Sequence, residues 1–211
     1  MRRREVLAAL AVLTLLPTTS FAAEATPQAE ALFKMIDQLD VEHNWPAGVH
    51  VTWKTGVPDG RPEPNEGKHT HCSTFVASAA MHAGIYILRP PEHPQTLLAN
   101  AQYEWLGNEG LRQGWRSLPD AAAAQAEANQ GSFVVAAYRN HKDDKPGHIV
   151  IIRPASKSRG QLMSEGPDVT QAGGTNYRVT SLKQGFAGHP HAFPDHEIVY
   201  FAHAVDPSQF R

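Results

Sequence analysis

Apolar residues recur at helical spacing directly after the only cysteine of the chain. Four of them lie at i, i+1, i+4 and i+8 and therefore share one face of a helix: Phe75, Val76, Ala79 and Ala83. Gly84 follows as a residue that can end the helix in the left-handed conformation. The pattern therefore places Cys72 at a helix N-terminus. Free backbone amides and the helix dipole favour an anion there, so we expect the thiol pKa to be lowered.

A second segment has the pattern of a buried strand. Pro146 and Gly147 form a turn, residues 148–152 are then mostly β-branched, and His148 opens the strand. Further strands are expected at residues 49–53, 132–138, 161–165, 168–172 and 197–203. Helices are expected to start at Pro27, to cover residues 95–107, and to run from residue 119 to near residues 129–131. Helices first and antiparallel strands second predict an α+β fold, with N-terminal helices packed on a central antiparallel sheet.

The first residues have the pattern of an export signal. Three arginines precede an apolar stretch at residues 6–16, which is too short to span a bilayer. Ser20-Phe21-Ala22 is a small-x-small cleavage site, so residues 1–22 are expected to be a signal and residues 23–211 a single domain. The paired arginines leave both the Sec and the twin-arginine route open. Because no cysteine follows the apolar stretch, no membrane anchor is expected, and the predicted location is periplasmic or extracellular.

Charge and cysteine content narrow the range of functions. The formal net charge is −2, and removal of the arginine-rich signal makes the remaining chain more acidic, which argues against a nucleic-acid partner. One cysteine cannot form an intramolecular disulfide. An exported protein with a lone thiol departs from the usual pairing of cysteines, and this favours a thiol kept for its reactivity.

A cysteine at a helix start and a histidine at a distant strand start match the nucleophile and general base of thiol hydrolases. The segments that carry the match are Cys72-Ser73-Thr74-Phe75-Val76 and Gly147-His148-Ile149-Val150. They resemble the NlpC-type and CHAP-type families of papain-like cysteine peptidases and amidases. The strand at 132–138 resembles the one that these families place before the histidine, although Ser132 replaces their usual aspartate. The resemblance covers roughly residues 45–203 and implies a papain-like fold and hydrolysis of peptidoglycan, with its stem peptide as substrate.

The histidine of such a pair needs a partner that orients its ring. Glu165 is our first candidate, because it lies 165 − 148 = 17 residues after His148 and the CHAP-type families carry a glutamate near that place. Gln171 and Asn176 are the alternatives, since a neutral amide can also hold an imidazole.

Several other residues are candidates for substrate binding. Trp53 could stack on a substrate, although a core aromatic is the alternative, and Ser73 adjoins the nucleophile. His71 could tune Cys72 electrostatically. The long loop at residues 55–71 is expected to form one wall of the substrate groove.

Twelve histidines also raise the question of metal binding. The pairs at residues 69 and 71 and at residues 189 and 191 fit no familiar zinc spacing, so we expect no metal and no cofactor. The leading hypothesis is an exported cysteine hydrolase of peptide or amide bonds in peptidoglycan. The alternatives are a binding or scaffold protein that leaves the thiol unused and a periplasmic metal-binding protein that uses the histidines.

Overall fold

The computed structural model describes residues 24–62 and 69–210. The expected export signal lies outside these residues, as does the middle of the long loop before Cys72. Within the described ranges, no helix is both long and apolar enough to cross a membrane.

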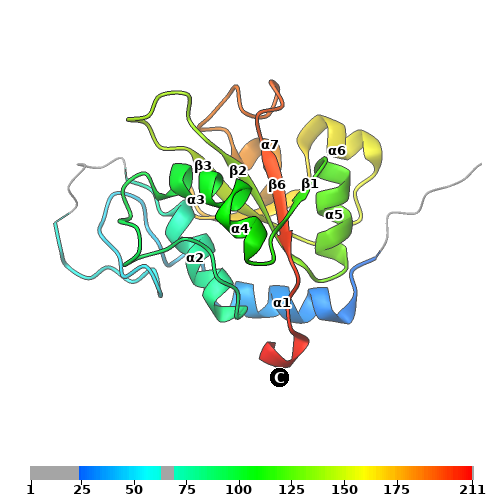
Figure 1. Ribbon diagram of the computed structural model, residues 1–211, viewed down its shortest axis with the longest axis horizontal. Coiled ribbons are helices and arrows are strands. Elements are labelled where there is room, and N and C mark those ends of the chain that lie inside the picture. Colours follow the sequence, from blue (N-terminus) through cyan, green and yellow to red (C-terminus); the bar gives the residue numbers. More distant parts are fainter. Residues whose placement is uncertain (1–23, 63–68, 211) are drawn as a thin grey trace, which may run out of the picture.

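An antiparallel sheet forms the centre of the molecule (Figure 1). In the described residues it has six strands in the spatial order β1-β6-β2-β3-β4-β5, and every neighbouring pair is antiparallel. The strands are β1 (Arg116–Leu118), β2 (Phe133–Tyr138), β3 (His148–Ile152), β4 (Asp168–Gln171), β5 (Tyr177–Ser181) and β6 (Val199–His203). Helices and an antiparallel sheet together make the fold mixed, in agreement with the α+β prediction.

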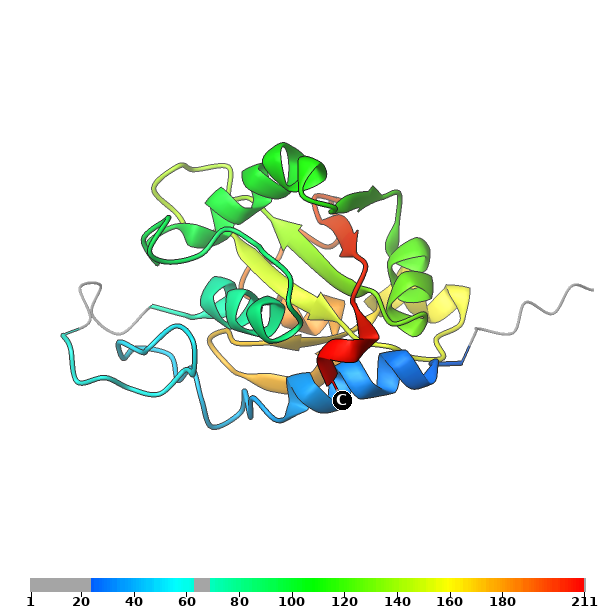
Figure 2. The same cartoon turned by 60° about the horizontal axis from the view of Figure 1, so that its bottom comes forward.

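The helices begin where the sequence supplies N-terminal caps. Thr26 accepts a hydrogen bond from the Ala29 amide, and Asp120 accepts one from the Ala123 amide. The helices are α1 (Pro27–Asp37), α2 (Cys72–His82), α3 (Leu98–Gly107), α4 (Glu109–Arg112), α5 (Ala121–Asn129), α6 (Arg159–Glu165) and α7 (Leu182–Gly185), with a 3-10 helix at Pro207–Phe210. Figure 2 shows α1 beside this C-terminal 3-10 helix, and the two are in contact.

Apolar packing covers both faces of the sheet. Successive residues of a strand point to opposite faces, and this alternation divides the core along β3. Ile149 and Ile151 pack in one cluster with residues of α1, α2 and α3. Val150 and Ile152 pack in a second cluster with residues of α5 and α7. The uninterrupted apolar run of β3 is therefore explained by a strand that is buried on both sides.

Two of the predicted elements are wrong. Residues 161–165 belong to α6 rather than to a strand, because Ser158 and Gln161 form a reciprocal capping box that starts a helix. Residues 49–53 form no strand, and only an isolated bridge joins Val51 to Pro58. The structure also contains β1 and β5, which the sequence pattern did not predict.

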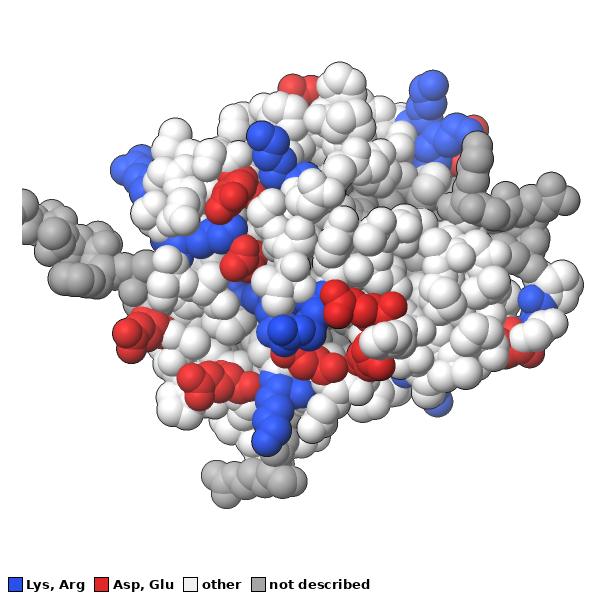
Figure 3. All heavy atoms as spheres, turned by 180° about the vertical axis from the view of Figure 1, so that it is seen from behind, with Lys and Arg blue, Asp and Glu red and all other residues white. Residues whose placement is uncertain are grey.

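Charged side chains of both signs are interspersed on the face opposite to that of Figure 1 (Figure 3). Several of the ion pairs join distant parts of the chain. Arg153 contacts Asp37 of α1 at 2.6 Å, and Lys157 contacts Asp168 of β4 at 2.7 Å. The mixed charge on this face agrees with the small net charge of the chain.

Candidate active site

Cys72 is the first residue of α2 and is 4 % exposed. Its sulfur is hydrogen-bonded by the backbone amides of Ile149 and Ser73, and the Ser73 hydroxyl adds a further contact. These donors favour the thiolate, but burial acts more strongly and raises the pKa of the Cys72 thiol. The expectation of a lowered pKa is therefore wrong for this structure. Burial outweighs the helix N-terminus, and the resting sulfur is a thiol at neutral pH.

His71 precedes Cys72 and is itself buried. Its Nε2 donates a hydrogen bond to the Val49 carbonyl at 2.9 Å, since a carbonyl can only accept. The Thr74 hydroxyl donates to the His71 carbonyl at 3.0 Å and closes the first turn of the helix. These bonds fix the entry of the chain into α2, so His71 holds the segment that carries Cys72.

His148 opens β3 directly after a glycine that the packing requires. A Cβ on Gly147 would lie 2.1 Å from the Tyr138 carbonyl oxygen and 2.5 Å from the Asn100 side-chain oxygen. No larger residue fits there without moving the backbone. The close approach of β2 to this turn therefore sets the point at which the histidine enters the sheet.

Gln171 at the end of β4 holds the ring of His148. The His148 Nε2 and Gln171 Oε1 atoms are 2.7 Å apart, and the Gln171 Nε2 donates to the Thr175 carbonyl at 3.0 Å. The second bond fixes the orientation of the amide, so the oxygen of Gln171 faces the imidazole and can only accept. The proton of the neutral ring therefore sits on Nε2, which leaves the lone pair of Nδ1 free to act as a base.

Two aromatic rings enclose the imidazole. Phe186 meets it edge-on with ring centroids 4.9 Å apart, and His189 stacks on it at 5.7 Å. Burial lowers the pKa of His148, while its contacts with Gln171 and the Gly185 backbone oppose that shift. Burial, followed by the neighbouring His148, also lowers the pKa of His189 to about 4. Both rings are therefore neutral at neutral pH.

A cavity of about 380 Å³ gives access to this group. Thr70, two residues before Cys72, lines it together with His148, Gln171 and His189. Further lining comes from the turn after β4 and from the end of α7. The cavity therefore borders the chain entering α2 and the imidazole at the same time.

The Cys72 thiol and the His148 imidazole are linked only by way of the backbone at the start of β3. The amide of Ile149, the residue after His148, donates to the Cys72 sulfur. The His148 ring lies on the strand face of Val150 and contacts Phe186 of the second core cluster. Within the described residues, no hydrogen bond joins the two side chains. The structure thus brings the starts of α2 and β3 together with the end of β4, around a neutral thiol and a neutral imidazole.

Glu165 does not orient His148. It is the last residue of α6, is partly exposed, and pairs with Lys157 at 3.1 Å. Gln171 occupies the orienting position instead. The first choice failed because the segment that was expected to be a strand is a helix. The side chain of Asn176 anchors a loop instead, since its Nδ2 donates to the backbone carbonyls of Val41, Asn44 and Trp45.

The other candidates have mainly structural contacts. Trp53 packs against the core beside α2, and Lys54 and Arg89 lie over its ring at 5.7 and 5.8 Å. Ser73 is buried, and its carbonyl accepts a hydrogen bond from Gln102 at 3.1 Å. Trp53 thus matches the core-aromatic alternative. The residues that sequence reasoning missed are Phe186 and His189, and His189 was considered only as part of a metal-like pair.

Histidine clusters offer little support for a metal centre. Across residues 24–62 and 69–210, no group of three or more histidine, cysteine, aspartate or glutamate side chains has the geometry to hold an ion. His189 stacks on His148, and His191 lies 3.6 Å from Asp195 on an exposed loop. His189 is therefore part of the wall of the cavity at His148, and His191 lies beside one carboxylate on the surface.

No protein-family model matches the chain, and a search of curated proteins finds no match.

Proposed function

We propose that this protein is an exported cysteine hydrolase that cleaves peptide or amide bonds in the stem peptides of peptidoglycan. Cys72 is the nucleophile, His148 the general base, and Gln171 the residue that orients the base. The observation that carries the proposal is the 2.7 Å bond from His148 Nε2 to Gln171 Oε1, because it leaves Nδ1 unprotonated at the start of the strand that contacts the Cys72 sulfur. A helix that begins at the cysteine and a strand of the antiparallel sheet that begins at the histidine also support a papain-like fold.

The reaction starts from the neutral pair. As the substrate carbonyl approaches, the Cys72 thiol transfers its proton to Nδ1 of His148, and the sulfur forms a bond to the carbonyl carbon. The backbone amide of Cys72 at the start of α2 is a donor for the developing oxyanion. The imidazolium then gives its proton to the departing amine as the carbon–nitrogen bond breaks. Water, deprotonated by His148, attacks the thioester and releases the acid and the thiol.

The neutral ground state has a consequence for reactivity. A buried thiol with a raised pKa forms little thiolate until a substrate displaces water and the proton moves to the base. Gln171 and the Gly185 backbone favour the imidazolium that this step creates. The site is therefore suited to a proton transfer that accompanies attack, rather than to a stable thiolate–imidazolium pair.

Peptidoglycan is the proposed substrate because the N-terminal segment has the pattern of an export signal and the two motifs resemble families that act on this polymer. The cavity at His148 is lined largely by backbone and uncharged polar residues, which suits hydrogen bonding to a peptide.

The test is incubation of the protein, without residues 1–22, with purified peptidoglycan, followed by measurement of newly released peptides and amino termini. Cys72→Ala and His148→Ala should each abolish release, and the double variant should be no worse, because nucleophile and base act as one unit. Glu165→Gln is the matched control and should keep its turnover. Cys72→Ser with near wild-type activity would contradict thiol attack. Cleavage of an unrelated amide without any release from peptidoglycan would keep the chemistry and reject the substrate.

A non-catalytic binding protein is the second candidate, and the burial of Cys72 favours it. In that case the thiol is a small apolar core residue, and the hydrogen-bonded His148 serves only packing. Alkylation with iodoacetamide at neutral pH separates the two candidates. In the hydrolase, His148→Ala should slow the modification of Cys72, whereas in a binding protein it should leave the rate unchanged or increase it by loosening the core.

A further inference from the structure

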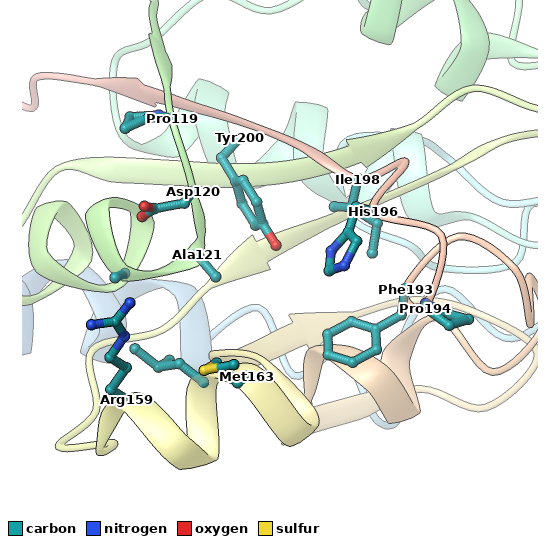
Figure 4. A pocket seen from close by; sticks show the side chains of 12 residues that line it. Pro119, Asp120, Ala121, Arg159, Met163, Phe193, Pro194, His196, Ile198 and Tyr200 are labelled. Atoms are coloured by element: carbon teal, nitrogen blue, oxygen red, sulfur yellow. The ribbon is translucent and has the colours of Figure 1, made fainter.

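A second cavity lies away from Cys72 and His148, between α5, α6 and β6 (Figure 4). Its volume is about 600 Å³, which is within the range of small-molecule sites at roughly 300–1,000 Å³. None of the residues that line the cavity at His148 lines this one. The two cavities are thus separate sites on the protein.

Most of the wall of this second cavity is apolar. It is formed by Leu162 and Met163 of α6, Ile198, and the side chains of Phe193 and Pro194 in the segment before β6. Met163 is 74 % exposed, although it lies beside this hollow. A ligand in the cavity would cover this exposed apolar side chain.

Three polar groups border the cavity without partners in the protein. Figure 4 shows the Tyr200 hydroxyl and the His196 ring pointing into it, with Arg159 at one end. Among the described residues, the side chains of these three form no hydrogen bond or ion pair. Asp120 also lines the cavity, and one of its carboxylate oxygens accepts a hydrogen bond from the Ala123 amide at 2.8 Å. Arg159 is therefore a cation that no carboxylate of the described chain neutralises.

The Tyr200 hydroxyl is a donor at all physiological pH values. Burial, together with the charge of Asp120, raises the pKa of Tyr200 to about 12. A neutral phenol and a guanidinium are both donors, and the charged guanidinium suits an acceptor that carries negative charge.

We propose that this cavity binds a small molecule with an apolar body and a single carboxylate. The carboxylate pairs with Arg159 at one end of the cavity. The apolar body lies against Phe193, Ile198 and Met163. This assignment does not depend on the activity of Cys72.

The test uses naphthalene-1-acetate as the probe and naphthalene-1-acetamide as its neutral match, with binding followed by titration calorimetry on the protein without residues 1–22. The acid should bind at one site per chain and at least about tenfold more tightly than the amide, because a charge-assisted pair is lost in the amide. Arg159→Gln should remove that preference. Lys183→Gln makes the same charge change on the exposed surface of α7 outside the cavity and should leave it intact.

Two further variants locate the site. Ala121→Trp should abolish binding of both probes, because the Ala121 methyl group points into the cavity in Figure 4. Met163→Glu should selectively weaken binding of the acid, whereas Met163→Gln should not. Both variants replace an exposed side chain that the fold does not need. Cys72→Ala should bind like the wild type. Absence of saturable binding, equal affinity for the acid and the amide, or binding insensitive to both Ala121→Trp and Met163→Glu would each overturn the proposal.

Discussion

Replacement of Gln171 by methionine tests the hydrogen bond on which the proposed site depends. Methionine keeps the length and volume of the side chain but removes its acceptor and its donor. The Thr175 carbonyl, which loses its donor, belongs to an exposed residue and can bind water. The His148 Nε2 belongs to a buried ring, and its proton would lose the Gln171 oxygen at 2.7 Å, which leaves the ring only its contact with the Gly185 backbone.

The size of the effect follows from the loss of this buried hydrogen bond. A buried hydrogen-bonding group left unsatisfied costs about 1–3 kcal/mol, so the free energy of unfolding should fall by that amount. If the same energy is lost from the orientation of the base, turnover should fall by about 5- to 160-fold. Gln171→Glu should behave differently, because a carboxylate beside the ring raises the pKa of His148 and stabilises the imidazolium.

Urea unfolding and peptidoglycan hydrolysis measure the two effects, and the rate of Cys72 alkylation against pH reports on the base. Gln171→Met should slow alkylation near neutral pH, and Gln171→Glu should shift the profile in the direction of more thiolate. Glu165→Gln is the control, because Glu165 pairs with Lys157 and makes no contact with His148. Unchanged stability and turnover in Gln171→Met, together with a crippled Glu165→Gln, would refute the reasoning.

Three other substitutions probe the surroundings of the site. His189 takes up a proton near pH 6.5 in the unfolded protein but only near pH 4 in the folded protein, so the free energy of unfolding should fall as the pH drops through this window. His189→Phe lacks this titration, so its deficit in unfolding free energy relative to wild type, measured in urea, should be smaller at pH 5 than at pH 7. Gly147→Ala should destabilise the protein by about 1–3 kcal/mol and reduce turnover, since its Cβ would meet the Tyr138 carbonyl at 2.1 Å, and an unchanged melting curve would contradict the packing argument. Asp37→Asn should cost about 1.5–3 kcal/mol in chemical denaturation, because Asp37 accepts two charge-assisted bonds from Arg153; a loss below 0.5 kcal/mol would make that pair dispensable.

Strong local patterns predicted the elements that carry the site. The apolar spacing after Cys72 predicted α2, and the β-branched run after Gly147 predicted β3 with its first residue at His148. A proline after a capping threonine likewise predicted α1. In each case the local preference and the tertiary environment agree, because each of these segments buries the apolar residues that define its pattern.

The strand predicted at residues 161–165 is wrong because helix capping dominates there. Ser158 and Gln161 start a helix there, and the chain has no buried residue in it that a strand would need. β5 was missed for a related reason: Tyr177–Ser181 lies at the edge of the sheet and is largely exposed, so it has no continuous apolar run. Edge strands are held by pairing with a neighbouring strand, and the local sequence pattern does not predict that pairing.

The sequence by itself determined the two segments that bear Cys72 and His148, because each combines a turn or loop with a regular apolar run. Only the tertiary structure decided which residue holds the histidine, since the end of β4 reaches His148 through strand pairing while Glu165 is carried away on a helix. The same holds for the protonation state of the site. The helix N-terminus favours a thiolate, but the burial that raises the pKa of Cys72 arises from packing across the whole chain.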